Sequence, residues 1–411
     1  MAYGDSAYQR AQAAGEDIIG MDKLAKAFLR QLARMPSGSI VGVLGGPGSG
    51  KTEFLRRVAW LVREQRDHLG LEDVDSLHSG YVWFNPWSYV KQGHFISGLV
   101  AHIARSGADT KAQLDRAREL VGQINRMSFD GTMGAGGGAA LNTTDIDPLE
   151  RVHGGFRDLV ESATGGDGGR LLVFIEDLDH LVPALRWSFL DALRLLSRSD
   201  AKTIVVAALG REAALEAVRS HEGNHLTDHS ATLRLEEILD LTLTVPNLEV
   251  RKIGSLLRTY IGEGEERLKR AFGAESIVRL SAATAHRPLG APRFLQRLAH
   301  RVTLLAEYAV EAGTRELSES QWAWVVVSER WPDFRRFMIR GGRERWIDLR
   351  NAVARLGKPS DPAASGVRPE MAQWLDRDLI LADYLRLHAD GFDRDAEGIF
   401  WLENLLLAAG L

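Results

Sequence analysis

Up to about residue 250, short runs of apolar residues alternate with longer segments in which apolar residues recur at helical spacing. Short apolar runs bounded by polar or glycine-rich turns are typical of buried strands, and five of them are found, at residues 40–44, 81–85, 171–175, 203–209 and 239–245. Segments with apolar residues at helical spacing lie before or between them, at residues 21–35, 54–62, 95–127, 148–163 and 181–196. Strands that alternate with helices predict an α/β fold, with a parallel doubly wound sheet flanked by helices.

Beyond residue 249 the apolar spacing is helical almost throughout, which predicts an all-α C-terminal region. A polar stretch, KPSDPAASGVRP, interrupts it before two last helical segments at residues 371–389 and 396–409. We therefore predict four parts: an N-terminal helical lead-in at 1–38, an α/β domain at 39–248, a helical lid domain at 249–357 and a C-terminal helical subdomain at 358–411.

A glycine-rich segment at about residues 128–147 has almost no periodicity, and it includes the sequence GAGGGAA. Such composition predicts a mobile loop or an insertion in the α/β domain. The alternative is an ordered functional loop, although glycine-rich segments of this length rarely pack.

Composition narrows the class of protein. The 411 residues carry a formal net charge of −4 with both signs abundant, so no overall basic field indicates nucleic acid or an anionic membrane as the partner. The absence of cysteine excludes disulfides and thiolate metal sites. No apolar run has the length of a membrane span, and the first residues lack the pattern of a secretory signal, so we expect a cytoplasmic protein without a transmembrane segment.

The first predicted strand runs directly into a glycine turn and a helix. The turn satisfies G-x-x-x-x-G-K-[ST], a phosphate-binding loop, in the strand-turn-helix context that its mechanism requires. Glycines let successive backbone N–H groups and the helix N-terminus face a polyphosphate. Lys51 is expected to reach the β- and γ-phosphates, and the Thr52 hydroxyl to bind Mg²⁺. The expected nucleotide-binding residues are Gly45, Gly46, Pro47, Gly48, Ser49, Gly50, Lys51, Thr52 and Glu53.

The strand at 171–175 ends in acids, which is the Walker B pattern. One carboxylate of Glu176 and Asp177 would hold Mg²⁺ while the other orients or deprotonates the attacking water. We therefore expect Thr52, Glu176 and Asp177 as metal ligands and Glu176, Asp177 and Lys51 as catalytic residues. Asp179 has an alternative interpretation, as the cap of the helix that follows.

Two further residues are candidates, each with an alternative interpretation. Asn85 follows the second predicted strand, and ligands of parallel sheets bind beyond the carboxyl ends of strands, so Asn85 is expected to face the nucleotide. It could equally form a turn beside a core aromatic pair. Arg293 begins a helix after a Gly-Ala-Pro turn, where its guanidinium could contact a γ-phosphate. The alternative is a surface arginine.

With these motifs in place, the chain resembles the KAP family of P-loop NTPases. The resemblance rests on the sequences WFNPW, FIEDLDHL, LEEILDLTLTVP and SERWPDF, which occur in this order. In that family the acids are usually Asp-Asp-x-Asp followed by Arg, whereas here Glu176 stands first and His180 last. The fourth strand is followed by Gly210, where the family usually has an acid. The resemblance implies a fold similar to STAND and AAA+ ATPases, whose helical domain supplies an arginine to the nucleotide, and Arg293 matches that place.

Many members of the family carry transmembrane helices between the phosphate-binding loop and the Walker B strand. This chain has no apolar run of that length, so it resembles a member without them. The resemblance implies an ATPase that acts as a nucleotide-dependent switch or assembly factor, with self-association or a protein partner, in bacterial signalling or antiviral defence against phage. ATP is expected because no Asn-Lys-x-Asp motif for guanine follows the fourth strand. A scaffold that binds nucleotide with little hydrolysis is the first alternative. An ATP-driven nucleic-acid remodeller is the second, with arginines at 287–301 as its only support.

Overall fold

The computed structural model describes residues 21–64, 76–92, 95–106, 110–132, 148–166, 168–223, 225–246, 248–285, 291–354 and 369–411. Residue contacts divide the chain into two compact units, an α/β unit at residues 20–246 and a helical unit at residues 247–411. Each unit has a core of its own, and each is described below by itself.

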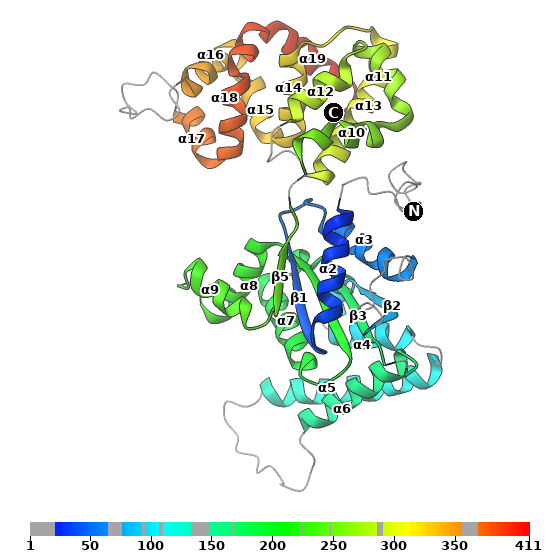
Figure 1. The fold of residues 1–411 in the computed structure, drawn as a ribbon. Helices are drawn as coiled ribbons and strands as arrows, with labels where there is room; N and C mark the ends of the chain where they lie inside the picture. Colours follow the sequence, from blue (N-terminus) through cyan, green and yellow to red (C-terminus); the bar gives the residue numbers. More distant parts are fainter. Residues whose placement is uncertain are drawn as a thin grey trace. The chain divides into compact units, whose positions relative to one another are not determined.

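The α/β unit is built on a five-stranded sheet in which every pair of neighbouring strands is parallel. The strand order is β2-β3-β4-β1-β5 (Figure 1). This confirms the predicted α/β class. The long apolar runs reflect burial on both faces of the sheet, and the strands are β1 (Ser39–Leu44), β2 (Leu77–Phe84), β3 (Arg170–Ile175), β4 (Thr203–Leu209) and β5 (Leu241–Thr244).

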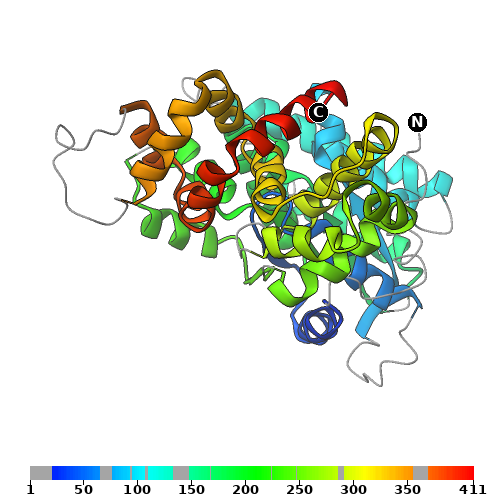
Figure 2. The same cartoon turned by 90° about the horizontal axis from the view of Figure 1, so that it is seen from above.

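Helices cover both faces of the sheet (Figures 1 and 2). On one face α2 (Asp22–Arg34) packs against α3 (Lys51–Glu64), with the rings of Phe28 and Phe54 5.3 Å apart. Side chains of the remaining helices form one apolar core with the alternate strand residues of the opposite face. These helices are α4 (Phe95–Arg105), α5 (Thr110–Thr132), α6 (Pro148–Ala163), α7 (Pro183–Ser197), α8 (Arg211–Glu222) and α9 (Asp228–Glu236).

Several predicted boundaries of this unit are wrong. The helix expected at 95–127 is two helices, because α4 ends at Arg105 and α5 begins at Thr110. Helix α5 continues to Thr132, so residues 128–132 of the predicted glycine-rich loop are helical. Helix α9 begins at Asp228, and its first turn is capped by the Thr227 side chain, which accepts from the backbone N–H of Ser230. Residues 1–20 and 133–147 lie outside the described residues.

The helical unit packs around α14 (Glu319–Arg330), whose residues 321–328 are all buried. Helices on both sides of the predicted boundary at residue 358 contact it, so both predicted helical parts contribute to one compact unit. The segment expected as one helix at 371–389 is two, because Asp378 caps a new helix. The other helices are α10 (Val250–Ile261), α11 (Glu265–Phe272), α12 (Ser276–Thr284), α13 (Pro292–Ala312), α15 (Pro332–Arg340), α16 (Gly342–Val353), α17 (Pro369–Arg377), α18 (Leu379–Arg394) and α19 (Ala396–Ala408).

A buried ion pair joins the two parts of this unit. Arg335 of α15 binds both carboxylate oxygens of Glu403 of α19, with Nε 3.0 and 2.9 Å from Oε1 and Oε2. The indole of Trp324 donates to the same carboxylate. Because buried charges need such partners, this network fixes α19 against α14 and α15.

None of the helices in the described part of the chain combines the length and the apolar character needed to cross a membrane.

Candidate functional site

The loop between β1 and α3 has the backbone that a phosphate-binding loop needs. Gly48 and Gly50 have φ angles of 74° and 96°, a region that favours glycine. A Cβ on Gly45 would lie 2.4 Å from Oγ of Ser49, so this position has no room for a side chain. The hydroxyl of Ser49 is buried and has no hydrogen-bond partner among the described residues. The loop therefore curls tightly into the N-terminus of α3, as its sequence predicts.

Lys51 is the first residue of α3, and its side chain turns back over this loop. Its Nζ donates to the carbonyl oxygens of Gly45 and Gly46, at 2.8 and 3.2 Å. The same Nζ lies 3.1 Å from Oδ2 of Asp179. The side chain is only 12% exposed, so this ion pair is partly shielded from water. The loop and the acids after β3 are thus brought together at one cation.

Asp179 has two partners that the sequence did not indicate. Besides binding Lys51, its carboxylate accepts a hydrogen bond from the backbone N–H of Gly210, just after β4. The interpretation of Asp179 as a helix cap is wrong, because α7 has Val182 at its N-cap and no side-chain cap. A Cβ on Gly210 would lie 3.3 Å from Oδ1 of Asp179. The departure from the resembled family at Gly210, noted above, therefore leaves room for the Asp179 carboxylate.

Asn85 and Asp177 meet at the ends of the neighbouring strands β2 and β3. The Nδ2 of Asn85 donates to Oδ2 of Asp177 at 2.7 Å. The Oδ1 of Asn85 accepts from the backbone N–H of Trp87 at 3.0 Å, which is the turn that the alternative interpretation expected. The turn is therefore confirmed, whereas the position of Asn85 toward a nucleotide stays a prediction. Asn85 forms the turn and also holds the carboxylate of Asp177.

Asp177 adopts a left-handed backbone conformation, with φ 59° and ψ 25°. This region is unusual for a residue other than glycine, although Asp and Asn enter it more readily than most. The conformation turns the chain from β3 into a short 3-10 turn, η4 (Leu178–His180). Glu176 precedes this turn, and its backbone N–H donates to the carbonyl of Phe84 at 3.1 Å.

A buried arginine that we did not predict holds this turn. Arg186 of α7 is 3% exposed. Its guanidinium donates to the carbonyls of Leu178, Asp179 and Leu181 at 3.1, 3.1 and 2.7 Å. It also donates to the carbonyl of Ala213 in α8.

Burial lowers the pKa of Arg186, while the carboxylates of Asp179 and Glu216 raise it. The sequence contains a clue to this role, because Arg186 lies on the same face of its helix as the buried Phe189, Leu190 and Leu193. A charged residue on an apolar face needs polar partners.

The remaining predicted residues lie in less informative surroundings. Thr52 and Glu53 are in the first turn of α3, and Glu53 accepts from Arg56 at 3.2 Å. Arg293 is the second residue of α13 in the helical unit and is exposed. Its role toward a nucleotide stays a prediction. Arg287, which lies in the same basic stretch, is outside the described residues.

The residues present fit a nucleotide bound with Mg²⁺. A buried hydroxyl without a partner among the described residues, a glycine turn at the N-terminus of a helix and a shielded lysine suit a polyphosphate. In the described part of the chain no group of three or more His, Cys, Asp or Glu residues could hold a metal. The predicted set of Thr52, Glu176 and Asp177 has two carboxylates, which suits an ion that takes its other ligands from phosphate and water.

The comparisons with known proteins agree with this geometry. The model of the KAP family P-loop domain matches residues 21–309, which include the whole α/β unit described here and the first helices of the helical unit. This confirms the resemblance seen in the sequence motifs. The search among curated proteins found no match.

Proposed function

Because the chain belongs to the KAP family of P-loop NTPases, we propose that it binds ATP with Mg²⁺, hydrolyses the γ-phosphate and uses the exchange of ATP for ADP as a switch. The observation that carries this proposal is Lys51, which contacts both the phosphate-binding loop and Asp179. When the nucleotide binds, the ammonium group of a lysine so placed can exchange its contacts with these protein oxygens for contacts with phosphate oxygens.

Mg²⁺ bound by Thr52 and one of the acids at 176–177 would neutralise charge on the phosphates. The chain's own residues have separate tasks. Asp177 accepts from Asn85, so its carboxylate is oriented before the nucleotide arrives. We assign it the task of orienting and deprotonating the attacking water, and Glu176 that of holding the metal. The fixed geometry matters because positioning supplies most of the rate enhancement in phosphoryl transfer.

We extend the proposal to Arg293 on the basis of the family resemblance and its place at the start of α13. A guanidinium that contacts the γ-phosphate binds the triphosphate better than the diphosphate. Only such a difference in affinity can shift an equilibrium between two conformations. Control of self-association or of a protein partner, in bacterial signalling or defence against phage, is the biological role that we propose.

A nucleotide-binding scaffold with slow hydrolysis is the second candidate. It is supported by the ion pair between Lys51 and Asp179, because phosphate must displace Asp179 before the lysine is available. It is also supported by Glu176, a longer acid than the one usual at this position.

The test is calorimetric titration of the purified protein with ATP and Mg²⁺, together with a phosphate-release assay. We expect wild type to bind and hydrolyse ATP, and Lys51→Ala to lose binding by about a hundredfold or more, because the cation offsets phosphate charge. Binding without turnover would favour the scaffold. Unchanged affinity in Lys51→Ala would refute the proposed site. Stimulation by single- or double-stranded DNA or RNA would favour the nucleic-acid remodeller instead.

A further inference from the structure

The α/β unit has a groove on the face of the sheet covered by α3. Six residues line this α3–β2 groove, which has a volume of about 420 Å³. Four lie on α3 at the spacing i, i+3, i+4 and i+7 and so share one helix face, and two alternate on the edge strand β2. They are Arg56, Ala59, Trp60, Arg63, Tyr81 and Trp83.

The groove combines aromatic rings with arginines. Trp60, Tyr81 and Trp83 are half-buried, whereas Arg63 is exposed and Arg56 is 51% exposed. Among the described residues that line it, none carries a carboxylate. Glu53 lies just beyond its end and accepts from Arg56 at 3.2 Å. An exposed pair of this kind contributes little and is easily exchanged for another anion.

The rings are held in place by residues behind them. Both Tyr81 and Trp83 lie 5.6 Å from the ring of Phe174, which is fully buried in β3. The guanidinium of Arg57 lies 4.2 Å from the ring centre of Trp60. Aromatic surfaces that are already ordered lose little conformational entropy when a flat ligand stacks on them.

We propose that the α3–β2 groove binds a nucleotide through its base and phosphate, either as a free nucleotide or as an unpaired residue of single-stranded nucleic acid. Planar bases stack on Trp and Tyr rings with little regard to sequence, while arginine binds phosphate oxygens. The volume lies within the range of small-molecule sites. The groove is separate from the phosphate-binding loop, because Ala59 lies about 12 Å along the axis of α3 from Lys51.

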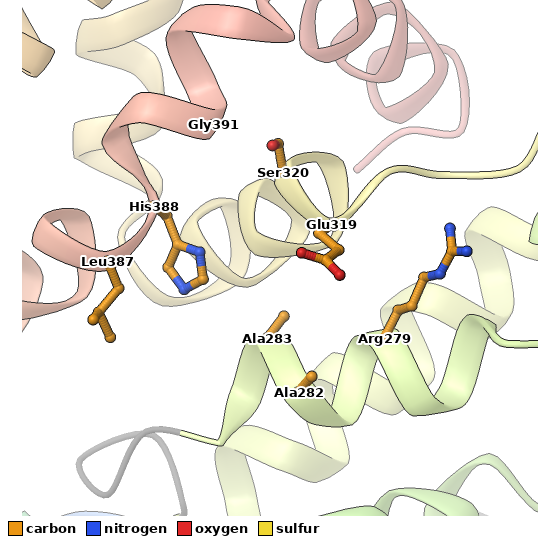
Figure 3. Close-up of a pocket in the computed structure, with 8 residues that line it drawn as sticks. All are labelled: Arg279, Ala282, Ala283, Glu319, Ser320, Leu387, His388 and Gly391. Carbon is orange, nitrogen blue, oxygen red and sulfur yellow. The ribbon is translucent and has the colours of Figure 1, made fainter.

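A cavity in the helical unit is less suited to an anion. It has a volume of about 250 Å³ and is lined by residues of α12, α14 and α18 (Figure 3). Its one arginine, Arg279, already pairs with Glu316 at 2.8 Å and Glu275 at 3.3 Å. Glu319 adds a further carboxylate to its lining. The residues that line this cavity include no Trp or Tyr on which a base could stack.

The test uses the full chain carrying Lys51→Ala, so that the phosphate-binding loop does not contribute. A fluorescein-labelled oligothymidylate of about twelve nucleotides is titrated and its anisotropy measured. We expect binding that survives Lys51→Ala, which separates this inference from the proposed ATPase. Arg56→Glu and Arg63→Glu are expected to weaken it about tenfold each and to reduce the salt dependence by about 0.7 per lost phosphate contact.

The control is Arg118→Glu on α5, which replaces an exposed arginine that also pairs with an acid three residues earlier. It should leave binding unchanged. Trp83→Leu tests the rings, with Trp401→Leu as its control, because Trp401 is an equally half-buried indole in the helical unit. These variants are compared only after their circular dichroism spectra match wild type.

Competitors identify the source of the ligand. Full displacement by AMP would assign the groove to free nucleotides, and displacement only by unlabelled oligonucleotide would assign it to nucleic acid. Equal displacement by polyglutamate, or affinity that is unchanged in both arginine variants, would show that base and phosphate are not recognised here and would overturn the inference.

Discussion

Arg186 offers the sharpest test of how the acids are held in place. Its side chain touches no predicted nucleotide-binding residue, yet it donates to the carbonyls of Leu178, Asp179 and Leu181 in the turn that carries the acids. We predict that Arg186→Met lowers both the stability of the α/β unit and the rate of ATP hydrolysis, while ATP affinity falls much less.

The magnitude follows from the bonds that are lost. Four carbonyl oxygens lose a charged donor, and each hydrogen bond has a net value of about 1 kcal/mol. Because methionine fills most of the space and the cost of burying a charge is removed, part of this loss is regained. We expect a net destabilisation of about 2–4 kcal/mol, together with at least a tenfold loss of hydrolysis from the less ordered turn.

The measurement is urea unfolding followed by far-UV circular dichroism, with phosphate release and ATP titration on the same preparations. Arg198→Met at the C-cap of the same helix is the control, because Arg198 is exposed and such surface substitutions usually change stability by less than about 0.5 kcal/mol. The unfolding midpoint and the hydrolysis rate of Arg186→Lys should lie between those of wild type and Arg186→Met, because lysine keeps the charge but has fewer donors. If Arg186→Met unfolds at the midpoint of wild type and hydrolyses ATP normally, the turn does not depend on this guanidinium and our reasoning is refuted.

Three further predictions concern the site and its surroundings. Asp177→Asn should retain ATP affinity and slow hydrolysis by about a hundredfold, because the amide accepts the left-handed backbone but cannot take a proton; if phosphate release persists and Glu176→Gln abolishes it, their roles are reversed. Arg293→Ala should weaken the preference for ATP over ADP and uncouple nucleotide from self-association, as measured by calorimetry and sedimentation; an unchanged ratio of affinities would leave Arg293 a surface residue. Burial and the charge of Arg105 lower the pKa of His102 in the folded protein, so below about pH 6.5 the unfolded chain binds this proton more readily and stability should fall. The urea midpoint should therefore drop between about pH 7.5 and pH 5, and less so in His102→Gln; equal pH dependence in both proteins would count against this assignment.

Features that depend on local sequence were predicted well. The apolar runs that became β1, β3 and β4 are buried on both faces, so each had to be almost continuously apolar. The loop at 45–50 was predictable because its glycines, lysine and flanking elements all lie within one short stretch. The hydrogen bond between Asn85 and Asp177 depends on the order of the strands, because β2 and β3 are neighbours in the sheet. The sequence around either residue does not indicate it.

Features that depend on distant residues were not predicted. The partners of Asp179 are Lys51, which is 128 positions before it, and the backbone of Gly210, which has no side chain to indicate a role. The hydrogen bonds of Arg186 go to backbone carbonyls, which every residue possesses, so no motif can reveal these partners. The contacts of Glu403 with Arg335 and Trp324 likewise join residues about 70 to 80 positions apart, and no sequence pattern indicates them.

The left-handed backbone of Asp177 has an evolutionary consequence. Such a conformation costs the fold of the order of 1 kcal/mol, which glycine at this position would recover. Folding stability therefore favours glycine at position 177, whereas the proposed chemistry favours aspartate. If the carboxylate acts as we propose, a lineage that no longer needed it could drift to glycine, which relieves the backbone but gives up the hydrogen bond from Asn85, whereas a lineage that keeps aspartate accepts the conformational cost. The identity of residue 177 among descendants of this protein is thus a record of whether its chemistry is still in use.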